Sequence, residues 1–223
     1  MRTRTVPAPR TFVRTAGLIG LVAIGALIVQ ARTEGRFLGS DHISRSPVYW
    51  LGEEVGTSML VRTPNGISFT YQTSGLPAGQ AVTLWVVVFN NPDACATDPC
   101  TVADMGNAAA QGDFLFGGGH VIGGSGRGNY GGHLAVGDTS GSGLAEIGGT
   151  SLGLIDPFTA EIQFALHSHG PAVPGQTLKA QLSSFLGGCE VFLGNADGIA
   201  DGPEDIPVNV GECVTFQSSV HQP

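Results

Sequence analysis

The sequence predicts an all-β protein, an antiparallel β-sandwich of the Greek-key or jelly-roll kind with long glycine-rich loops. Two observations carry this prediction. Short segments alternate apolar and polar residues, or are apolar throughout, as strands do. Clusters of glycine and proline separate these segments, and glycine alone accounts for 35 of the 223 residues. Lysines are scarce and no charged segment repeats with a helical period, which argues against a helical protein.

Each strand is expected where such a segment occurs. Residues 67–73 (ISFTYQT) alternate cleanly, and residues 81–90 (AVTLWVVVFN) are apolar on both faces, which is typical of a central strand. Further strands are expected at residues 113–122, 133–138, 160–168, 181–187 and 213–220. One short helix is expected at residues 101–110, with Thr101 as its N-cap and Asp104 at its third helical position.

The N-terminus is expected to be a signal peptide, residues 1–31. Four arginines precede an apolar run at residues 16–29, and Val29-Gln30-Ala31 offers the small-x-small pattern of a cleavage site. The alternative is an uncleaved anchor. Residues 32–66 are less patterned and are expected to form an extended arm that ends as an edge strand. Residues 67–223 are expected to form a single sandwich domain. The prediction is therefore an exported protein, secreted or periplasmic.

The charge of the chain excludes two classes of partner. Four of the 10 basic residues lie in the predicted signal peptide and all 18 acidic residues lie outside it, so the mature chain carries a net charge near −12. Binding to nucleic acid or to an anionic membrane surface requires a basic face, which this chain lacks. A calcium ion, a cationic partner, or an extracellular protein or carbohydrate partner is compatible with this charge. Acidity that only keeps an exported protein soluble is the simpler interpretation.

The four cysteines predict two disulfides, because an even number in an exported chain is typical of a disulfide framework. Proximity in the sequence favours Cys95 with Cys100 and Cys189 with Cys213 over the other two pairings.

Three segments carry a resemblance to known proteins: FTYQTSGLPAGQAVTLWVVVFNNPDAC (69–95), AEIQFALHSHGPAVPGQ (160–176) and QLSSFLGGC (181–189). They resemble a set of exported bacterial proteins and, more distantly, the chordin-type (CHRD) domain, an extracellular all-β module. That domain is similar in its strand followed by a Gly-Leu-Pro turn and in a His-x-His on a later strand. The glycine and proline residues after His169 depart from its pattern. The resemblance covers roughly residues 67–217 and implies no catalytic residue.

The His-x-His pair is the first candidate site. A period of two places Ile162, Phe164, Leu166 and Ser168 on one face of the strand, and Glu161, Gln163, Ala165, His167 and His169 on the other. The two imidazoles then project together from the strand end, roughly 6–7 Å apart at the backbone, which suits Zn²⁺ or Cu²⁺. His120, His133 and Glu161 are the residues expected to complete the ligand set. The alternative is that both rings are polar tips at the solvated end of the strand, bonded to loop carbonyls.

A second candidate is a calcium loop within residues 194–207. Asn195, Asp197 and Asp201 are spaced as oxygen ligands around Gly198, and Ile199 would contribute its carbonyl. The pattern departs from the EF-hand because Ile206 stands where the bidentate glutamate belongs. The alternative is a solvated acidic loop.

Other motifs assign no catalytic residue. Residues 126–131 (GRGNYG) fit a dinucleotide fingerprint formally, but they are expected to form a hairpin loop. Residues 137–141 (GDTSG) have Thr139 where a serine protease needs its nucleophile, and Ser140 would require partners brought from elsewhere. Among the aromatic residues, Trp85 and Tyr71 are expected in the core. Tyr49 and Trp50 are expected either to bind carbohydrate or to pin the N-terminal arm.

The sequence therefore predicts a secreted, non-enzymatic module that binds a metal ion or a partner surface. The alternative is a copper- or zinc-dependent oxidoreductase that uses His167 and His169. A copper/zinc dismutase needs a ligand order that this chain lacks, because after His169 only His221 remains, at a C-terminus expected to be frayed.

Overall fold

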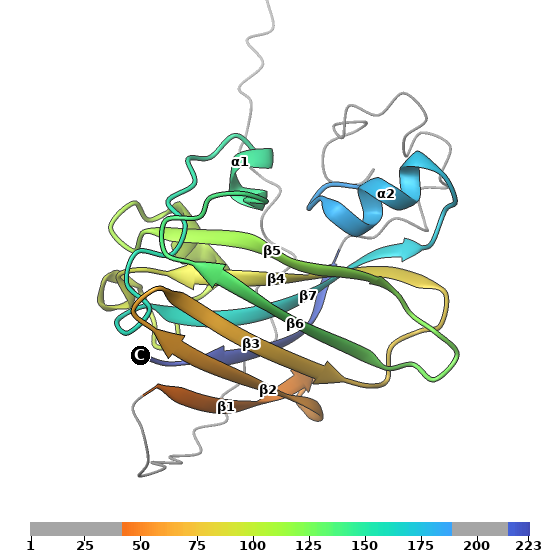
Figure 1. Ribbon diagram of the computed structural model, residues 1–223, viewed down its shortest axis with the longest axis horizontal. Helices are drawn as coiled ribbons and strands as arrows, with labels where there is room; N and C mark the ends of the chain where they lie inside the picture. The colour runs from red at the N-terminus through yellow and green to blue at the C-terminus, as the bar shows by residue number, and fades with distance from the viewer. Residues whose placement is uncertain (1–41, 189–213) are drawn as a thin grey trace, which may run out of the picture.

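Eight antiparallel strands form one continuous sheet in the computed structural model, which describes residues 42–188 and 214–223 (Figure 1). The strands are β1 (Ile43–Trp50), β2 (Glu53–Thr63), β3 (Gly66–Thr73), β4 (Gln80–Phe89), β5 (Gly112–Val121), β6 (Gly128–Ala135), β7 (Glu161–Pro171) and β8 (Val214–His221). The helices are η1 (Pro92–Ala94), η2 (Val102–Gly106), α1 (Gly143–Glu146) and α2 (Gln176–Ser183). The all-β prediction is confirmed. In the part of the chain that the structure describes, no helix has the length and apolar character needed to cross a membrane.

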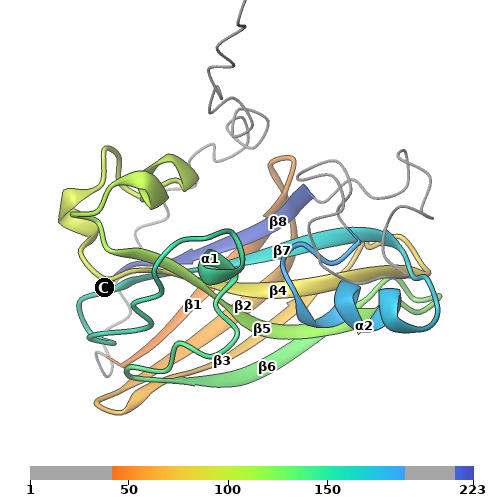
Figure 2. The same cartoon turned by 90° about the horizontal axis from the view of Figure 1, so that it is seen from above.

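The sheet has the strand order β5-β4-β7-β8-β1-β2-β3-β6 and folds back on itself, so that its two end strands approach each other (Figure 1). One half then faces the other across the core. The ring of Phe164 on β7 lies 5.0 Å from that of Phe69 on β3 and 6.1 Å from that of Tyr71. Seen from above, α1 and α2 lie against the outer side of the half that contains β4, β5 and β7 (Figure 2).

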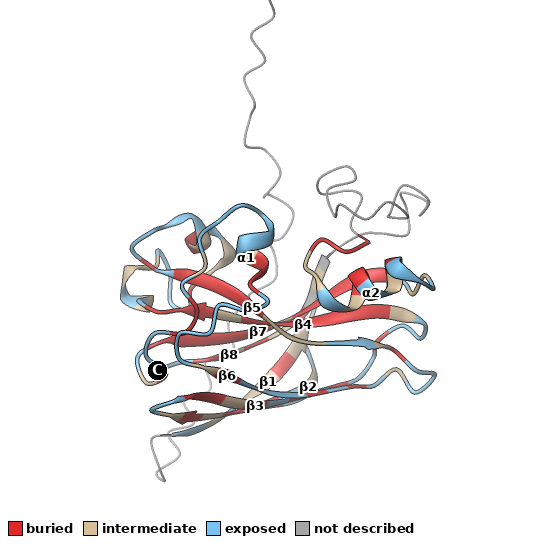
Figure 3. Cartoon of the chain, turned by 45° about the horizontal axis from the view of Figure 1, so that its top comes forward, coloured by how far each residue is buried: buried red, intermediate tan, exposed pale blue. Residues whose placement is uncertain are grey.

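Strand β4 lies at the centre of its half, between β5 and β7, as its apolar sequence predicts. Its alternate residues Val82, Leu84, Val86 and Val88 enter the core between the two halves. Trp85, which projects to the opposite side, is also buried. Buried residues accordingly dominate β4 and β7, whereas β6 carries many exposed ones (Figure 3). The double-sided burial of β4 follows from the helices and loops that cover its outer face.

Residues 43–63, which the sequence places in an extended arm, form β1 and β2 instead. Neither is an edge strand, because β1 lies between β8 and β2, and β2 between β1 and β3. The buried Arg62 of β2 donates to the carbonyl oxygens of Ala160 and Gln222, at 2.8 and 2.9 Å. It thereby fixes the end of β8. His221, expected to be frayed, is buried there and bonded to Ser44 and Ser58.

The prediction of a strand at residues 181–187 is wrong, because Gln181 belongs to α2. The alternation of apolar and polar residues in this segment continues for only a few residues. The buried residues of α2 are Thr177, Ala180 and Gln181, whose spacing is that of one helical face. Strand β7 also runs further than expected, to Pro171, because Gln80 at the start of β4 pairs with that residue. Likewise β6 begins at Gly128, within the predicted hairpin loop 126–131.

The loop after β4 confirms the predicted disulfide and N-cap, but its helix is shorter than the predicted 101–110, a 3-10 helix that ends at Gly106. Cys95 and Cys100 form a disulfide, and the short helix η2 has Thr101 as its N-cap. The carboxylate of Asp104 accepts the backbone N–H of Thr101 at 2.8 Å, which completes a capping box. Cys189 and Cys213 lie outside the described residues, as do the predicted signal peptide at residues 1–31 and the first part of the arm.

Candidate functional site

His167 and His169 project from the same face of β7, as the period of two predicts, and their ring centroids lie 4.9 Å apart. They are not at a solvated strand end. Their relative exposures are 1 % and 0 %, because α2 and the residues that follow it cover this face of the sheet. The ring of Phe185 stacks on His167 at 4.7 Å and lies 5.3 Å from the ring of Trp85. The histidines therefore belong to a packed outer layer between the sheet and α2.

The hydrogen bonds of His169 define its protonation state. Nδ1 lies 2.6 Å from the carbonyl oxygen of Gly187, which only accepts, so Nδ1 carries the proton. Nε2 then accepts from the hydroxyl of Thr83 at 2.7 Å, and that hydroxyl accepts from Nε1 of Trp85 at 2.8 Å. Both nitrogens of a neutral imidazole are thus engaged within the protein. A metal ion at Nε2 would have to displace Thr83.

Burial keeps both histidines neutral. Desolvation lowers the pKa of His169 to about 4, against a smaller opposing effect of its bond to Gly187. It lowers the pKa of His167 well below the usual value, with a further contribution from His169. Neutral imidazoles are the form that binds Zn²⁺ or Cu²⁺, so protonation state does not oppose the predicted site. Whether a metal ion can bind at this pair therefore depends on the further ligands.

The other predicted ligands lie apart from this pair. Residues paired across antiparallel strands project to the same face, so His120 shares the face of Val82, while His167 shares that of Thr83. Successive residues of β4 project to opposite faces, so His120 and His167 are on opposite sides of the sheet.

His133 and Glu161 are also separated from the histidine pair. His133 lies on β6, in the other half, where its Nδ1 is 3.1 Å from the hydroxyl of Ser68. Glu161 begins β7, six residues before His167 and so about 20 Å along the strand. It instead accepts the backbone N–H of Cys100 and the amide of Gln163. Across residues 42–188 and 214–223, no three His, Cys, Asp or Glu side chains are grouped so as to hold a metal ion.

The predicted calcium loop, with Asn195, Asp197, Ile199 and Asp201, lies outside the described residues. That site stays a prediction from the sequence.

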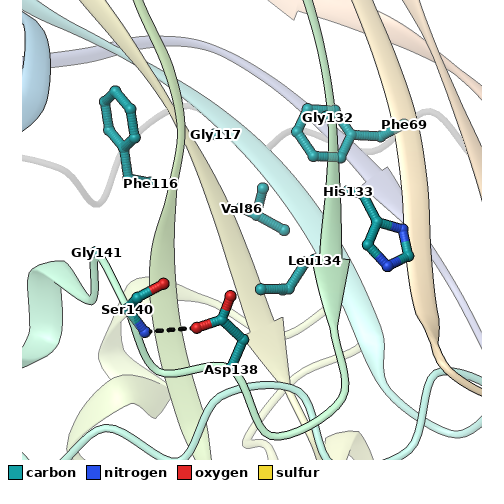
Figure 4. Close-up of a pocket in the computed structure, with 10 residues that line it drawn as sticks. All are labelled: Phe69, Val86, Phe116, Gly117, Gly132, His133, Leu134, Asp138, Ser140 and Gly141. Atoms are coloured by element: carbon teal, nitrogen blue, oxygen red, sulfur yellow. Dashed lines mark hydrogen bonds between the residues drawn. The ribbon is translucent and has the colours of Figure 1, made fainter.

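A groove of about 340 Å³ lies between β5 and β6, the two end strands of the sheet (Figure 4). The side chains of Phe69, Val86 and Leu134 form an apolar floor, and Asp138 and Ser140 lie at one end. The complete lining is Phe69, Val86, Phe116, Gly117, Gly132, His133, Leu134, Asp138, Ser140 and Gly141.

Glycines on both edges account for this groove. On β5, Gly117 falls at a register shift opposite Leu84 and Trp85, where a Cβ would lie 3.0 Å from the Leu84 carbonyl oxygen. On β6, a Cβ at Gly132 would lie 2.8 Å from the ring of Phe69, so the absent side chain lets that ring form part of the wall. Two edges without side chains at these points leave the space between them unfilled.

The buried carboxylate of Asp113 positions the end of the groove. It accepts the hydroxyl of Ser142 at 2.9 Å and the backbone N–H groups of Leu152 and Gly153 at 2.9 and 2.8 Å. These bonds hold the loop that begins at the groove residues Asp138 and Ser140. The carboxylate of Asp138 accepts the N–H of Ser140 at 2.9 Å, and hydrogen bonds from Ser140 lower the pKa of Asp138. The groove therefore ends at a negative charge.

The same view tests the serine-protease interpretation of residues 137–141. Asp138, Ser140 and His133 all line the groove, but the ring of His133 points away from the other two (Figure 4). It lies instead beside Ser68. Ser140 therefore has no histidine placed to take its proton among the residues of this groove.

No protein-family model, curated protein or solved structure matches this chain.

Proposed function

We propose that the protein is an exported, non-enzymatic binding module whose ligand occupies the groove between β5 and β6. The observation that carries this proposal is the shape and chemistry of the groove: an open space with an apolar floor and a charged end. Binding sites of this kind bury the apolar part of a ligand and use a few polar groups to orient it. Export rests on the predicted signal peptide and agrees with the disulfide between Cys95 and Cys100.

The rigidity of the walls supports a binding role. Val86 belongs to the central strand β4, and Leu134 and Phe69 lie on paired strands of the same sheet. A ligand therefore meets a preformed surface and pays little to order it. The groups in the groove also suit binding better than catalysis, because Asp138 is held by Ser140 and His133 points elsewhere.

A thermal-shift screen tests this proposal. The panel contains neutral sugars, amino acids, small organic cations and short extended peptides, each added to the purified protein. A compound that binds the folded state raises its melting temperature. We expect at least one such compound, and we expect Ser140→Trp, which fills the exposed end of the groove, to abolish the rise. Glu54→Gln, an exposed change on β2, is the matched control and should leave it intact. A rise that survives Ser140→Trp, or no rise with any compound, contradicts the proposal.

The shared face of His167 and His169 favours one alternative, a copper- or zinc-dependent oxidoreductase. Elemental analysis of protein purified without chelator separates the two. Stoichiometric copper or zinc that is lost in both His167→Ala and His169→Ala would establish the alternative. Under the proposed function, both histidine variants are less stable than the wild type, and neither differs from it in metal content.

A further inference from the structure

The two end strands of the sheet differ in how far their outer edges are covered. Beyond its pairing with β4, strand β5 is bonded midway along its length by the loop after β6, where the N–H of Phe116 donates to the Gly141 carbonyl at 2.9 Å. The outer face of its C-terminal end lies under α2, because a Cβ at Gly119 would be 2.0 Å from the carbonyl oxygen of Leu182. Strand β6 pairs with β3 alone in the described part of the chain. Near its start it approaches β5, where the ring of Tyr130 lies 6.2 Å from that of His120. Beyond that point, the edge of β6 is the open edge of the sheet.

The sequence of β6 leaves this edge unprotected. Natural edge strands are usually guarded by charged side chains, proline or bulges, because an uncovered edge recruits further strands. The eight residues of β6, GNYGGHLA, contain neither a charge nor a proline. Asn129, Gly131 and Gly132 are exposed, and the two glycines have no side chain of their own that could shield the edge.

We propose that the edge of β6 binds an extended peptide of a partner protein as an added strand, with its apolar side chains in the groove and a basic side chain at Asp138. This inference rests on the proposed function and extends it by naming the class of ligand. Backbone hydrogen bonds to β6 would supply affinity and the groove would select alternate side chains, as in other cases of strand addition.

Two properties of the groove specify the peptide. Its floor of Phe69, Val86 and Leu134 is apolar, and side chains of a strand alternate between its two faces, so every second residue should be aliphatic. Asp138 and His133 are the titratable residues of the groove lining, Asp138 is its one carboxylate, and the whole chain carries a net charge of −8. A basic residue is therefore expected at the end of the peptide that lies beside Asp138.

The test uses fluorescein-labelled Lys-Val-Lys-Val-Lys-Val amide and fluorescence anisotropy with the purified protein. Two further peptides carry N-methyl groups on the lysines only or on the valines only. Each set removes the backbone donors on one edge of the extended peptide. We expect the unmodified peptide to bind, and at least one N-methylated peptide to bind about tenfold more weakly or worse, because several hydrogen bonds are lost together. Equal binding of all three peptides would overturn strand addition, and so would no binding of the unmodified peptide.

Protein variants locate the peptide. Ser140→Trp should abolish binding, and Asp138→Asn should weaken it about two- to fivefold, as expected for an exposed ion pair. The matched control Glu54→Gln should have no effect. Asp138, Ser140 and Glu54 are all exposed, so the variants are expected to fold, which circular dichroism verifies. The acidic peptide Glu-Val-Glu-Val-Glu-Val amide should not bind, and equal binding of this peptide would overturn the charge selection.

The failure of this inference is distinguishable from the failure of the proposed function. If a sugar, amino acid or small cation raises the melting temperature in a manner that Ser140→Trp abolishes, while the lysine–valine peptide does not bind, strand addition is overturned and the groove remains the ligand site. If neither the panel nor the peptide binds, both proposals fall.

Discussion

The imidazole Nδ1 of His169 on β7 lies 2.6 Å from the carbonyl oxygen of Gly187, beyond the end of α2. This single bond ties the segment after the helix to the strand beneath it. Gln181 of α2 adds to the attachment, because its side-chain amide donates to the carbonyl oxygens of His169 and Pro171, at 3.0 and 2.9 Å. The pair that the sequence marks as metal ligands thus holds α2 against the sheet.

The buried histidines make the protein less stable in mild acid. The pKa of His169 falls from about 6.5 in the unfolded chain to about 4 in the fold, and that of His221 to about 3. Between pH 6.5 and pH 4 the unfolded state binds more protons than the folded state. The stability is therefore fully present above pH 6.5 and is lost as pH falls toward 4. His169 alone should cost on the order of 2 kcal/mol between pH 7 and pH 5. Urea unfolding at the two pH values measures it.

His169→Gln is the control for this prediction. Glu146 and Glu161, whose pKa values are raised by burial, act with the opposite sign, and the variant leaves them in place. The variant should be less stable at pH 7, and its stability should depend less on pH. If wild type and variant lose equal stability on acidification, His169 does not titrate on unfolding as described.

Gly119→Ala should weaken the attachment of α2. The added Cβ would lie 2.0 Å from the Leu182 carbonyl oxygen, which is backbone and cannot rotate away. We expect a loss of about 1–3 kcal/mol in the free energy of unfolding, as for other overpacked sites. Gly123→Ala meets no atom within 4 Å and is the matched control. Equal stability of the two variants would show that α2 does not pack on Gly119.

Asp113→Ala should loosen the loop at the end of the groove. It removes the acceptor of two serine hydroxyls and of several backbone N–H groups, including those of Leu152 and Gly153. Leaving buried donors unpaired costs about 1–3 kcal/mol each, so we expect a loss of several kcal/mol at most and a faster amide exchange in residues 138–153. Unchanged exchange there would mean that other contacts hold this loop.

The calcium prediction for Asn195, Asp197 and Asp201 has its own test. Calcium at a hundredfold excess over Kd should add about 2.7 kcal/mol to the stability of the folded state. The melting temperature should then fall on addition of chelator, and Asp197→Ala should remove that sensitivity. Identical melting curves with and without chelator would leave a plain acidic loop.

Patterns within single strands were predictable from the sequence, and relations between distant segments were not. The alternation around Phe69 and Phe164 correctly placed β3 and β7, and the period of two correctly placed His167 and His169 on one face. Phe185 and Gly187 cover these histidines. Both belong to residues 181–187, where the few alternating residues are compatible with the end of a helix as well as with a strand. The sequence around His167 and His169 therefore could not predict that the pair is buried.

The groove could not be predicted from the sequence for a related reason. Gly117 and Gly132 lie on opposite sides of the groove only because the sheet folds back and brings its two end strands, β5 and β6, together. Their local signal was glycine in a strand, which often marks a bulge or a close approach. That signal was present, but its meaning depended on pairing between residues far apart in the sequence.

The most direct test of the groove as the ligand site is an NMR titration of ¹⁵N-labelled protein with the compound that raises the melting temperature most. We expect amide shifts to concentrate at Gly117, Gly132, Leu134 and Ser140, while Thr83 and Gly187 beside the histidines stay unchanged. Shifts centred on Thr83, Phe185 and Gly187, with the groove amides unmoved, would contradict this expectation.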